Sequence, residues 1–335
     1  MLKDKIIDRF AASADLIGID RSRCLRMRFN KNECSQCTGV CRSNAISIRE
    51  DVSIDFRLCS ECMLCVSACP SECFDIKSFD FFSVLARLRK IKDSVPVPVL
   101  SCNMRSDVQA HVKTPCLGLL SEEHLLALAV FPDSEIHINM TECGDCKNAF
   151  IADKVMERAG RLEEECSFNI SEKIVIIKEK KRLNFSDNAY GRRGFFSALK
   201  NLTLIQAAEI FENNNAGMAS QAYSAKKVPL KRDLLNRVYV FMNGQGSELM
   251  KACYYTVNLN EDCNNCFACV GMCPAGALKI SKDDADPVSR LLFNTSLCNG
   301  CALCRDFCFN NALHIKKGFS GMNPLEFAPL NREIK

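Results

Sequence analysis

The chain has 335 residues, of which 47% are hydrophobic and 25% are charged. This composition is typical of soluble globular domains and excludes a largely disordered chain. The net charge of +4 gives no indication of nucleic-acid binding. No uninterrupted apolar run reaches the roughly 18 residues of a membrane-spanning helix, and the N-terminus lacks the apolar core of a signal peptide. We therefore expect a cytoplasmic protein with two or three domains.

Cysteine is the unusual part of the composition. The sequence contains 23 cysteines, no tryptophan and only 4 histidines. Cysteine at this density indicates disulfides, zinc sites or iron–sulfur clusters. Disulfides need an oxidising compartment, which does not fit the expected cytoplasmic location. We therefore expect the thiols to serve mainly as metal ligands.

The N-terminal region combines an expected helix over 1–20 with a first cysteine module over 21–78. The module has one complete C-x2-C-x2-C-x3-C motif, which comprises Cys59, Cys62, Cys65 and Cys69. It also has a shortened motif, which comprises Cys34, Cys37 and Cys41. The complete spacing lets a tight loop offer three thiolates to one iron–sulfur cluster, while the fourth cysteine reaches a second cluster. A zinc site would instead need two CxxC pairs separated by a longer stretch.

The next segment, 79–182, is expected to form a small α/β domain. Its predicted strands are 95–100, 135–140 and 173–178, and its predicted helices are 121–130 and 149–165. Ser121 is followed by two acidic residues, which is typical of a helix start. Strands that alternate with helices predict a parallel sheet.

This α/β domain carries its own thiols in the connecting segments: Cys102, Cys116, Cys143 and Cys146. Loops at the carboxyl ends of parallel strands are where such folds place ligands. Gly118 and Gly144 would let the backbone approach a ligand closely. A further cysteine, Cys166, falls at a predicted helix end and is expected to be structural.

Residues 183–250 are expected to contain a helix and a flexible linker. An amphipathic pattern runs over 190–211, and the polar segment 212–227 predicts a linker that would let the flanking modules move relative to each other. The GRRGFF segment in the helix resembles a twin-arginine export signal. It lies far from the N-terminus and Lys200 interrupts the apolar run, so we interpret it as a packing or partner-docking helix.

A second cysteine module covers 251–318, and a tail covers 319–335. The module contains two complete motifs, Cys263, Cys266, Cys269 and Cys273, and then Cys298, Cys301, Cys304 and Cys308. In both modules, the final cysteine of each motif is followed by a small residue four positions later, an apolar residue at five and Ile at seven. The four small residues are Ala45, Cys73, Ala277 and Ala312. The repeat predicts a half-buried strand in each copy and a duplicated two-cluster template.

These motifs resemble the bacterial two-cluster ferredoxin family twice, over 20–78 and 253–317. The resemblance implies an α+β fold in which two such modules, each with two [4Fe–4S] clusters, flank the α/β domain. By the family's crossed ligation, each cluster takes three cysteines of one motif and the final cysteine of the other. The implied sets are Cys263, Cys266, Cys269 and Cys308; Cys298, Cys301, Cys304 and Cys273; and Cys59, Cys62, Cys65 and Cys41. The last site has Cys34, Cys37 and Cys69 and lacks a fourth ligand in register.

Three alternatives exist for the missing ligand: Cys24, Cys73, or none, which would leave a three-iron cluster or an open iron. Cys73 stands at the small-residue position, so we interpret it as a packed thiol. Cys24 lies ten residues before Cys34, as Cys253 lies ten before Cys263. This spacing indicates a shared template position, so we favour Cys24, brought back by a strand and turn between it and Cys34.

The order of thiols in the α/β domain is similar to that in the iron–sulfur delta subunit of methyl-viologen-reducing hydrogenases, over roughly 100–150. This family has a pair of cysteines where the present chain has Cys102 alone. The resemblance implies a fifth cluster, of [2Fe–2S] type, bound by the domain's four connecting-segment cysteines. A zinc site and a redox-active CxxC pair are the competing interpretations.

The sequence thus predicts a polyferredoxin-like electron carrier that relays electrons between unidentified redox partner proteins. No dinucleotide or P-loop motif occurs. One alternative is a redox enzyme subunit in which the CxxC pair Cys143/Cys146 or the incomplete cluster site is catalytic. Another is a metal-assembly scaffold or sensor. The basic residues of the first module form either a solvated face or a surface that steers an acidic partner.

Overall fold

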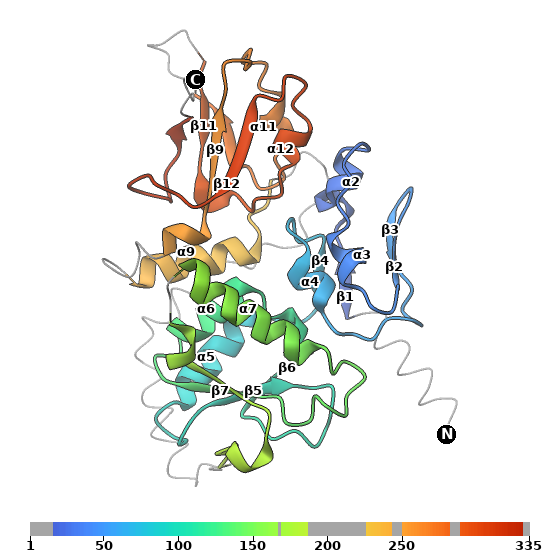
Figure 1. The fold of residues 1–335 in the computed structure, drawn as a ribbon, viewed down its shortest axis with the longest axis vertical. Helices are drawn as coiled ribbons and strands as arrows, with labels where there is room; N and C mark the ends of the chain where they lie inside the picture. Colours follow the sequence, from blue (N-terminus) through green and yellow to red (C-terminus); the bar gives the residue numbers. More distant parts are fainter. Residues whose placement is uncertain (1–15, 167–168, 187–225, 243–249, 282–288, 331–335) are drawn as a thin grey trace.

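The computed structural model describes residues 16–166, 169–186, 226–242, 250–281 and 289–330. Helices and small β-sheets are mixed along the chain, as expected for an α+β protein. Figure 1 shows the N-terminal unit on one side, the central sheet with its helices below, and the C-terminal unit above, with helix α9 between these last two. In the described part of the chain, no helix is long and apolar enough to cross a membrane.

The first unit contains two pairs of antiparallel strands and three short helices. Its elements are β1 (Ile17–Ile19), α2 (Leu25–Arg28), α3 (Gln36–Val40), β2 (Ile46–Ile48), β3 (Val52–Ile54), α4 (Leu64–Ala68) and β4 (Phe74–Ile76). Strand β1 pairs with β4, and β2 pairs with β3. The first and last strands therefore close the unit around the inner hairpin.

The second unit repeats this topology. Its elements are β9 (Tyr255–Leu259), α11 (Ala268–Met272), β10 (Leu278–Ile280), β11 (Leu291–Phe293), α12 (Leu303–Asp306) and β12 (Leu313–Lys317). Strand β9 pairs with β12 and β10 pairs with β11, while β13 (Ala328–Pro329) adds to β11. The strands predicted after the four final cysteines are present as β2, β4, β10 and β12.

The central domain is built on a parallel sheet with the strand order β6-β5-β7-β8. Its elements are α5 (Phe81–Ile91), β5 (Val99–Cys102), β6 (Val112–Thr114), α6 (Glu122–Val130), β7 (Ile136–Asn139), α7 (Ile151–Cys166) and β8 (Ile174–Ile177). The predicted parallel sheet, α6 and α7 are confirmed, whereas α5 and β6 have no counterpart in the prediction. The first strand starts only at Val99 because Pro96 and Pro98 lack the N–H that a ladder needs.

Packing joins the first unit, the central domain and α9 (Leu230–Met242) into one apolar core. Leu234, Leu235 and Val238 of α9 are fully buried in it, and α9 lies against α6. The second unit has a smaller core of its own. The central domain and the first unit therefore share one hydrophobic core and are not separate domains.

Three expectations are corrected. Ile17–Ile19 is a strand rather than part of a helix over 1–20, because Ile17 is buried where β1 pairs with β4. The strand expected after Cys24 is the short helix α2, with Leu25 buried. The two units also contact each other directly, through an Asn32 Nδ2–Asp306 Oδ2 hydrogen bond of 2.9 Å, instead of being joined only by a linker.

Several predicted segments lie outside the described residues. They are the first 15 residues of the expected N-terminal helix, the helix over 190–211 with its GRRGFF segment, the linker up to residue 225, and the end of the tail.

Candidate metal centres

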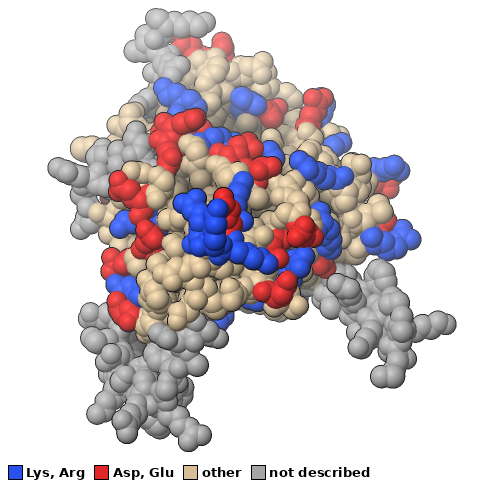
Figure 2. Space-filling view, turned by 60° about the horizontal axis from the view of Figure 1, so that its bottom comes forward, with Lys and Arg blue, Asp and Glu red and all other residues tan. Residues whose placement is uncertain are grey.

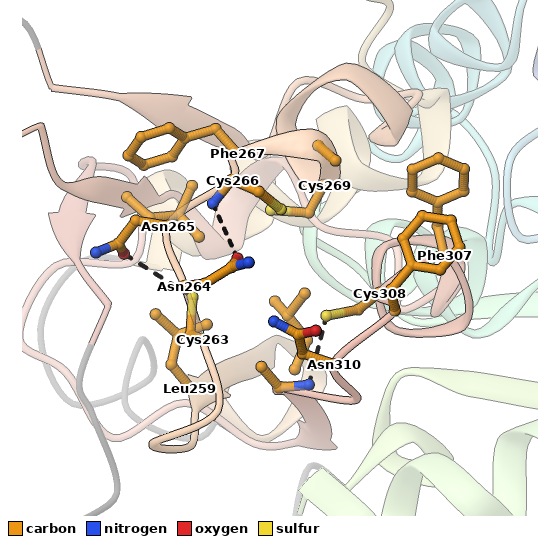
Figure 3. Close-up of a pocket in the computed structure, with 15 residues that line it drawn as sticks. Leu259, Cys263, Asn264, Asn265, Cys266, Phe267, Cys269, Phe307, Cys308 and Asn310 are labelled. Carbon is orange, nitrogen blue, oxygen red and sulfur yellow. Dashed lines mark hydrogen bonds between the residues drawn. The ribbon is translucent and has the colours of Figure 1, made fainter.

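The thiols of the two units gather around four cavities, which we call sites A to D. Site A comprises Cys24, Cys34, Cys37 and Cys69; site B comprises Cys41, Cys59, Cys62 and Cys65; site C comprises Cys263, Cys266, Cys269 and Cys308; and site D comprises Cys273, Cys298, Cys301 and Cys304. Figure 3 shows the first three cysteines of site C on one segment of the chain and Cys308 on another, around the same cavity. Each site thus combines cysteines of one half-unit with the final cysteine of the other half.

The three complete motifs share a backbone shape that makes their sulfurs converge. In each loop, the residues two and four positions after the first cysteine have positive φ. These residues are Glu61 and Met63 in site B, Asn265 and Phe267 in site C, and Gly300 and Ala302 in site D. A left-handed conformation is costly for residues other than glycine and persists only where the surroundings enforce it. Site A lacks this pattern: Ser35, which follows Cys34 and precedes helix α3 as Phe267 precedes α11, has a φ of −128°.

The turn that follows each final cysteine is also repeated. The third residue after the cysteine has positive φ in all four copies: Asn44, Glu72, Gly276 and Asn311. The next backbone N–H then points at the cysteine sulfur, at 3.2 Å from Cys73 N to Cys69 Sγ and 3.3 Å from Ala277 N to Cys273 Sγ. Because this N–H approaches the sulfur closely, the fourth residue after each final cysteine has a small side chain. An N–H aimed at sulfur favours the charged thiolate.

Cys24 occupies the place of a first motif cysteine, although the spacing hides it. The N–H of Asp20, just after β1, donates to the carbonyl of Cys73 at 2.8 Å. Asn260, just after β9, donates in the same way to Ala312 at 3.0 Å, and Cys263 follows three residues later. Cys24 follows four residues after Asp20, so it corresponds to Cys263.

The sequence argument that pairs Cys24 with Cys253 is therefore wrong. Cys24 lies after the first strand of its unit, whereas Cys253 lies before the first strand of the other unit. Cys253 is also disulfide-bonded, so its sulfur is not a thiolate. An insertion that contains α2 separates Cys24 from Cys34 and produces the apparent ten-residue coincidence.

Site A contains a fifth thiol, because Cys73 also lines its cavity. The Cys73 thiol donates a hydrogen bond to the Cys24 sulfur, which lowers the pKa of Cys24 to about 6. The same hydrogen bond raises the pKa of Cys73 itself. The backbone position of Cys24, equivalent to that of Cys263, makes it the candidate ligand, and Cys73 is its hydrogen-bonding neighbour.

Most of the other cysteines of sites A to D lie in surroundings that favour the neutral thiol, so a thiolate there needs a nearby positive charge. Burial, together with neighbouring thiolates, raises the pKa of Cys37 and of Cys298 to about 12. Metal coordination is the usual way in which several crowded thiols become deprotonated together. The donor sets of sites A to D therefore fit a metal-containing group.

The geometry fits a cluster better than a single ion. Within the described ranges, no group of three or more Cys, His, Asp or Glu side chains converges on one metal position. Instead, the four thiols of each site surround a cavity. An iron–sulfur cluster binds each thiolate at a separate iron corner, so its ligands stand apart in this way.

The central domain brings three of its four predicted cysteines around one cavity, which we call the middle site, whereas Cys116 does not line this cavity. Cys102, Cys143 and Cys146 line one cavity with Arg105 and Glu142. Burial raises the pKa of Cys116 to about 12, with contributions from the Cys102, Cys62 and Cys143 thiolates. Cys116 is therefore close both to the middle site and to Cys62 of site B.

The backbone of the two sites meets at Gly118. A Cβ atom at this position would lie 2.0 Å from the Cys62 carbonyl oxygen. The Gly118 carbonyl accepts a hydrogen bond of 2.7 Å from Ser67 Oγ, and the buried Arg158 reaches Ser67 Oγ at 2.9 Å. Gly118 was expected to allow close approach to a ligand. It allows close approach to the site B loop instead.

Site C differs from the other sites in having an exposed cysteine. Cys266 is exposed, and Phe309, next to Cys308, is 84% exposed. Cys143 and Cys146 are half-buried. On the face in Figure 2, basic and acidic side chains are interspersed around a central group of Lys and Arg.

The sequence analysis did not identify Lys226, Lys231 and Arg232, which lie beside sites A and D, because they bind backbone carbonyls of the cysteines.

Comparisons with protein-family models, with curated proteins and with solved structures find no match to this chain.

Proposed function

We propose that the protein is an iron–sulfur electron carrier in which sites A to D hold four [4Fe–4S] clusters. The observation that carries this proposal is the crossed grouping of cysteines around four cavities, four around each of sites B, C and D and four with the additional Cys73 around site A, by two units of one topology. The two-module ferredoxin arrangement implied by the sequence is part of the same proposal.

The clusters would supply one-electron redox chemistry, and the chain's own residues hold and insulate them. Backbone N–H groups directed at Cys69 and Cys273 stabilise negative charge on the ligating sulfurs. Apolar neighbours such as Met63, Leu64 and Leu303 are almost fully buried and exclude water. Hydrogen bonds to sulfur and solvent exclusion are the means by which a protein sets cluster potentials.

The middle site would hold a fifth cluster, of [2Fe–2S] type, with zinc as the alternative occupant. Its closeness to Cys62 through Cys116 supports electron exchange with site B. A redox partner protein would meet the chain at site C, where Cys266 is exposed to solvent.

The alternative function, a redox enzyme subunit, is favoured by one observation. The cavity that contains Cys143 and Cys146 is also lined by Arg105 and Glu142, whose charged groups could bind a polar substrate. Replacing both cysteines with Ala distinguishes the two functions. Loss of electron throughput alone indicates a carrier, whereas loss of a defined small-molecule reduction with sites A to D intact indicates a catalytic site.

A redox titration of the anaerobically prepared protein, followed by EPR, tests the carrier function. We expect reversible one-electron reduction of several clusters at low potential. A Cys266→Ser variant should change the signal of one cluster only, because the other three cavities do not include this residue. A protein with no reversible signal would contradict the proposal.

A further inference from the structure

A short segment that leads into α9 places three cations against predicted ligands of sites A and D. Lys231 Nζ donates to the carbonyl of Cys69 in site A at 2.7 Å. Lys226 Nζ donates to the carbonyl of Cys273 in site D at 2.7 Å. Arg232 Nη1 lies 3.4 Å from the carbonyl of Cys298, also in site D. One stretch of seven residues, 226–232, therefore contacts both units of the molecule.

The two lysines occupy equivalent positions on two half-units, the second half of the first unit and the first half of the second unit. Cys69 and Cys273 both end a complete motif and follow a five-residue helix, α4 or α11. Besides the cysteine carbonyl, Lys231 contacts the carbonyl of Ser67 at 3.0 Å, and Lys226 contacts the carbonyl of Gly271 at 2.7 Å. Each ammonium group thus caps the carboxyl end of the helix beside a ligand.

The segment is firmly held at its α9 end. The Glu72 carboxylate accepts hydrogen bonds from the N–H groups of Leu230 and Lys231, at 2.6 and 2.7 Å. Lys231 is 9% exposed and Arg232 is 2% exposed. Arg232 also pairs with Glu123 of α6 at 2.8 Å. The cations are therefore fixed in place rather than loosely attracted.

The insertion between Cys24 and Cys34 of site A reaches the second unit, where the rings of Phe29 and Phe307 meet edge to face at 5.1 Å, and Phe307 lines the cavity of site C. The same insertion carries Arg28, whose backbone N–H donates to the Cys24 carbonyl at 3.0 Å. Burial lowers the pKa of Arg28, while the Cys273 and Cys301 thiolates of site D raise it. Arg28 thus links the backbone of site A to the surroundings of site D.

We propose, on the basis of the cluster-binding function above, that segment 226–232 raises the reduction potentials of sites A and D together and makes them the junction through which electrons pass between the two units. Reduction adds one electron, and hence one negative charge, to a cluster. A fixed ammonium group nearby stabilises the reduced state more than the oxidised state. When an electron crosses the junction, one of the two sites is oxidised and the other is reduced, with no further reactant.

The test uses the full chain with its clusters and compares Lys226→Gln, Lys231→Gln and Lys227→Gln. Lys227 is the matched control, because it is exposed and adjacent but only its backbone N–H is engaged, with Pro274. Potentials are measured by EPR-monitored redox titration. We expect Lys226→Gln and Lys231→Gln each to lower the potential of one cluster by about 59 mV, a tenfold change in its reduction equilibrium. Lys227→Gln should leave all potentials unchanged.

Unchanged potentials in both Lys226→Gln and Lys231→Gln would overturn the proposal, as would an equal shift in Lys227→Gln. Lys226 is exposed, so its variant gives a result even if the buried Lys231 cannot be replaced without unfolding. Iron and sulfide contents are measured on the same samples. Full cluster content with unchanged potentials defeats this inference alone, whereas absence of clusters from the unsubstituted protein defeats the proposed function.

Discussion

At the residue scale, two neighbouring thiols decide what site A can hold. Cys24 stands where the other half-units have their first motif cysteine, and Cys73 stands where they have Ala45, Ala277 or Ala312. Both sulfurs line the same cavity. Their different backbone positions assign the ligand role to Cys24 and a hydrogen-bonding role to Cys73.

Replacement of each thiol by alanine separates these roles. We expect Cys24→Ala to convert site A to a three-iron cluster or to empty it, because only three ligands in register remain. Cys73→Ala restores the residue type of the other copies, so it should keep a four-iron cluster and alter only its potential. EPR of the oxidised protein detects the three-iron form. A three-iron signal from Cys73→Ala but not from Cys24→Ala would reverse the assignment.

His124 predicts an acid-sensitive contribution to stability. Its ring is buried against Phe81, and burial lowers its pKa to about 3 from an ordinary value of 6.5. Since the folded pKa lies below the unfolded one, the stabilising contribution is complete above pH 6.5 and is lost as the pH falls towards 3. Between pH 7.5 and 5.5, this loss amounts to about 1.4 kcal/mol.

Denaturant unfolding of the protein and of His124→Gln at these two pH values measures the effect. The variant should be less stable at pH 7.5, but its stability should depend less on pH. Glu123, with a pKa of about 2, titrates outside this window and does not interfere. Equal pH dependence in both proteins would mean that folding does not lower the pKa of His124.

At the scale of elements, the turn after Cys116 fixes the central domain to the site B loop. The 3-10 helix η2 (Leu117–Leu119) brings Gly118 so close to Cys62 that no side chain fits between them. Asn148, before α7, adds a hydrogen bond of 3.0 Å to the carbonyl of Ser60 in the same loop. These contacts tie the middle site and site B together.

A Gly118→Ala substitution tests this contact. The new Cβ would meet the Cys62 carbonyl at 2.0 Å, so either the loop or η2 must move. Overpacking of this kind costs about 1–3 kcal/mol, and we also expect an altered EPR signal from site B. Gly144→Ala is the control, since nothing lies within 4 Å of its added Cβ. Equal effects of the two substitutions would argue against a specific contact at Gly118.

Particular residues explain which elements were predictable. The apolar pattern after each final cysteine predicted β2, β4, β10 and β12, because alternating side chains reflect a half-buried strand. Ser121 and the acids after it predicted the start of α6, where Ser121 is the N-cap. Strand β6 is only three residues long and carries no such pattern. Helix α2 stands where a strand was expected, because a segment this short does not distinguish the hydrophobic period of a helix from that of a strand.

In the candidate sites, too, some residues could be predicted from the sequence and others could not. The resemblance to two-cluster ferredoxins, carried by the regular spacing, implied the cysteine groups of sites B, C and D, and the same cysteines line the three cavities. The role of Cys24 depended on the backbone pairing of Asp20 with Cys73, which an insertion conceals in the sequence. Lys226, Lys231 and Arg158 act on backbone carbonyls, and such acceptors leave no mark in a sequence.

At the scale of the whole molecule, the five sites form a series of neighbours. The turn at Gly118, after Cys116, packs against the Cys62 carbonyl of site B, sites A and B share the first unit, and sites C and D share the second. The contact between the units joins Phe29, in the insertion of site A, to Phe307 at the cavity of site C, and the thiolates of site D act electrostatically on Arg28 of the same insertion. Such an order suits a relay between two partners that bind at opposite ends.

The central claim, that the grouped thiols hold iron–sulfur clusters, is tested most directly by metal and sulfide analysis of anaerobically purified protein. Four clusters, with or without a fifth at the middle site, predict about 16–20 iron atoms per chain and a matching amount of acid-labile sulfide. One zinc per chain in addition would assign zinc to the middle site. Zinc equal to or above the iron content, or iron without sulfide, would contradict the account.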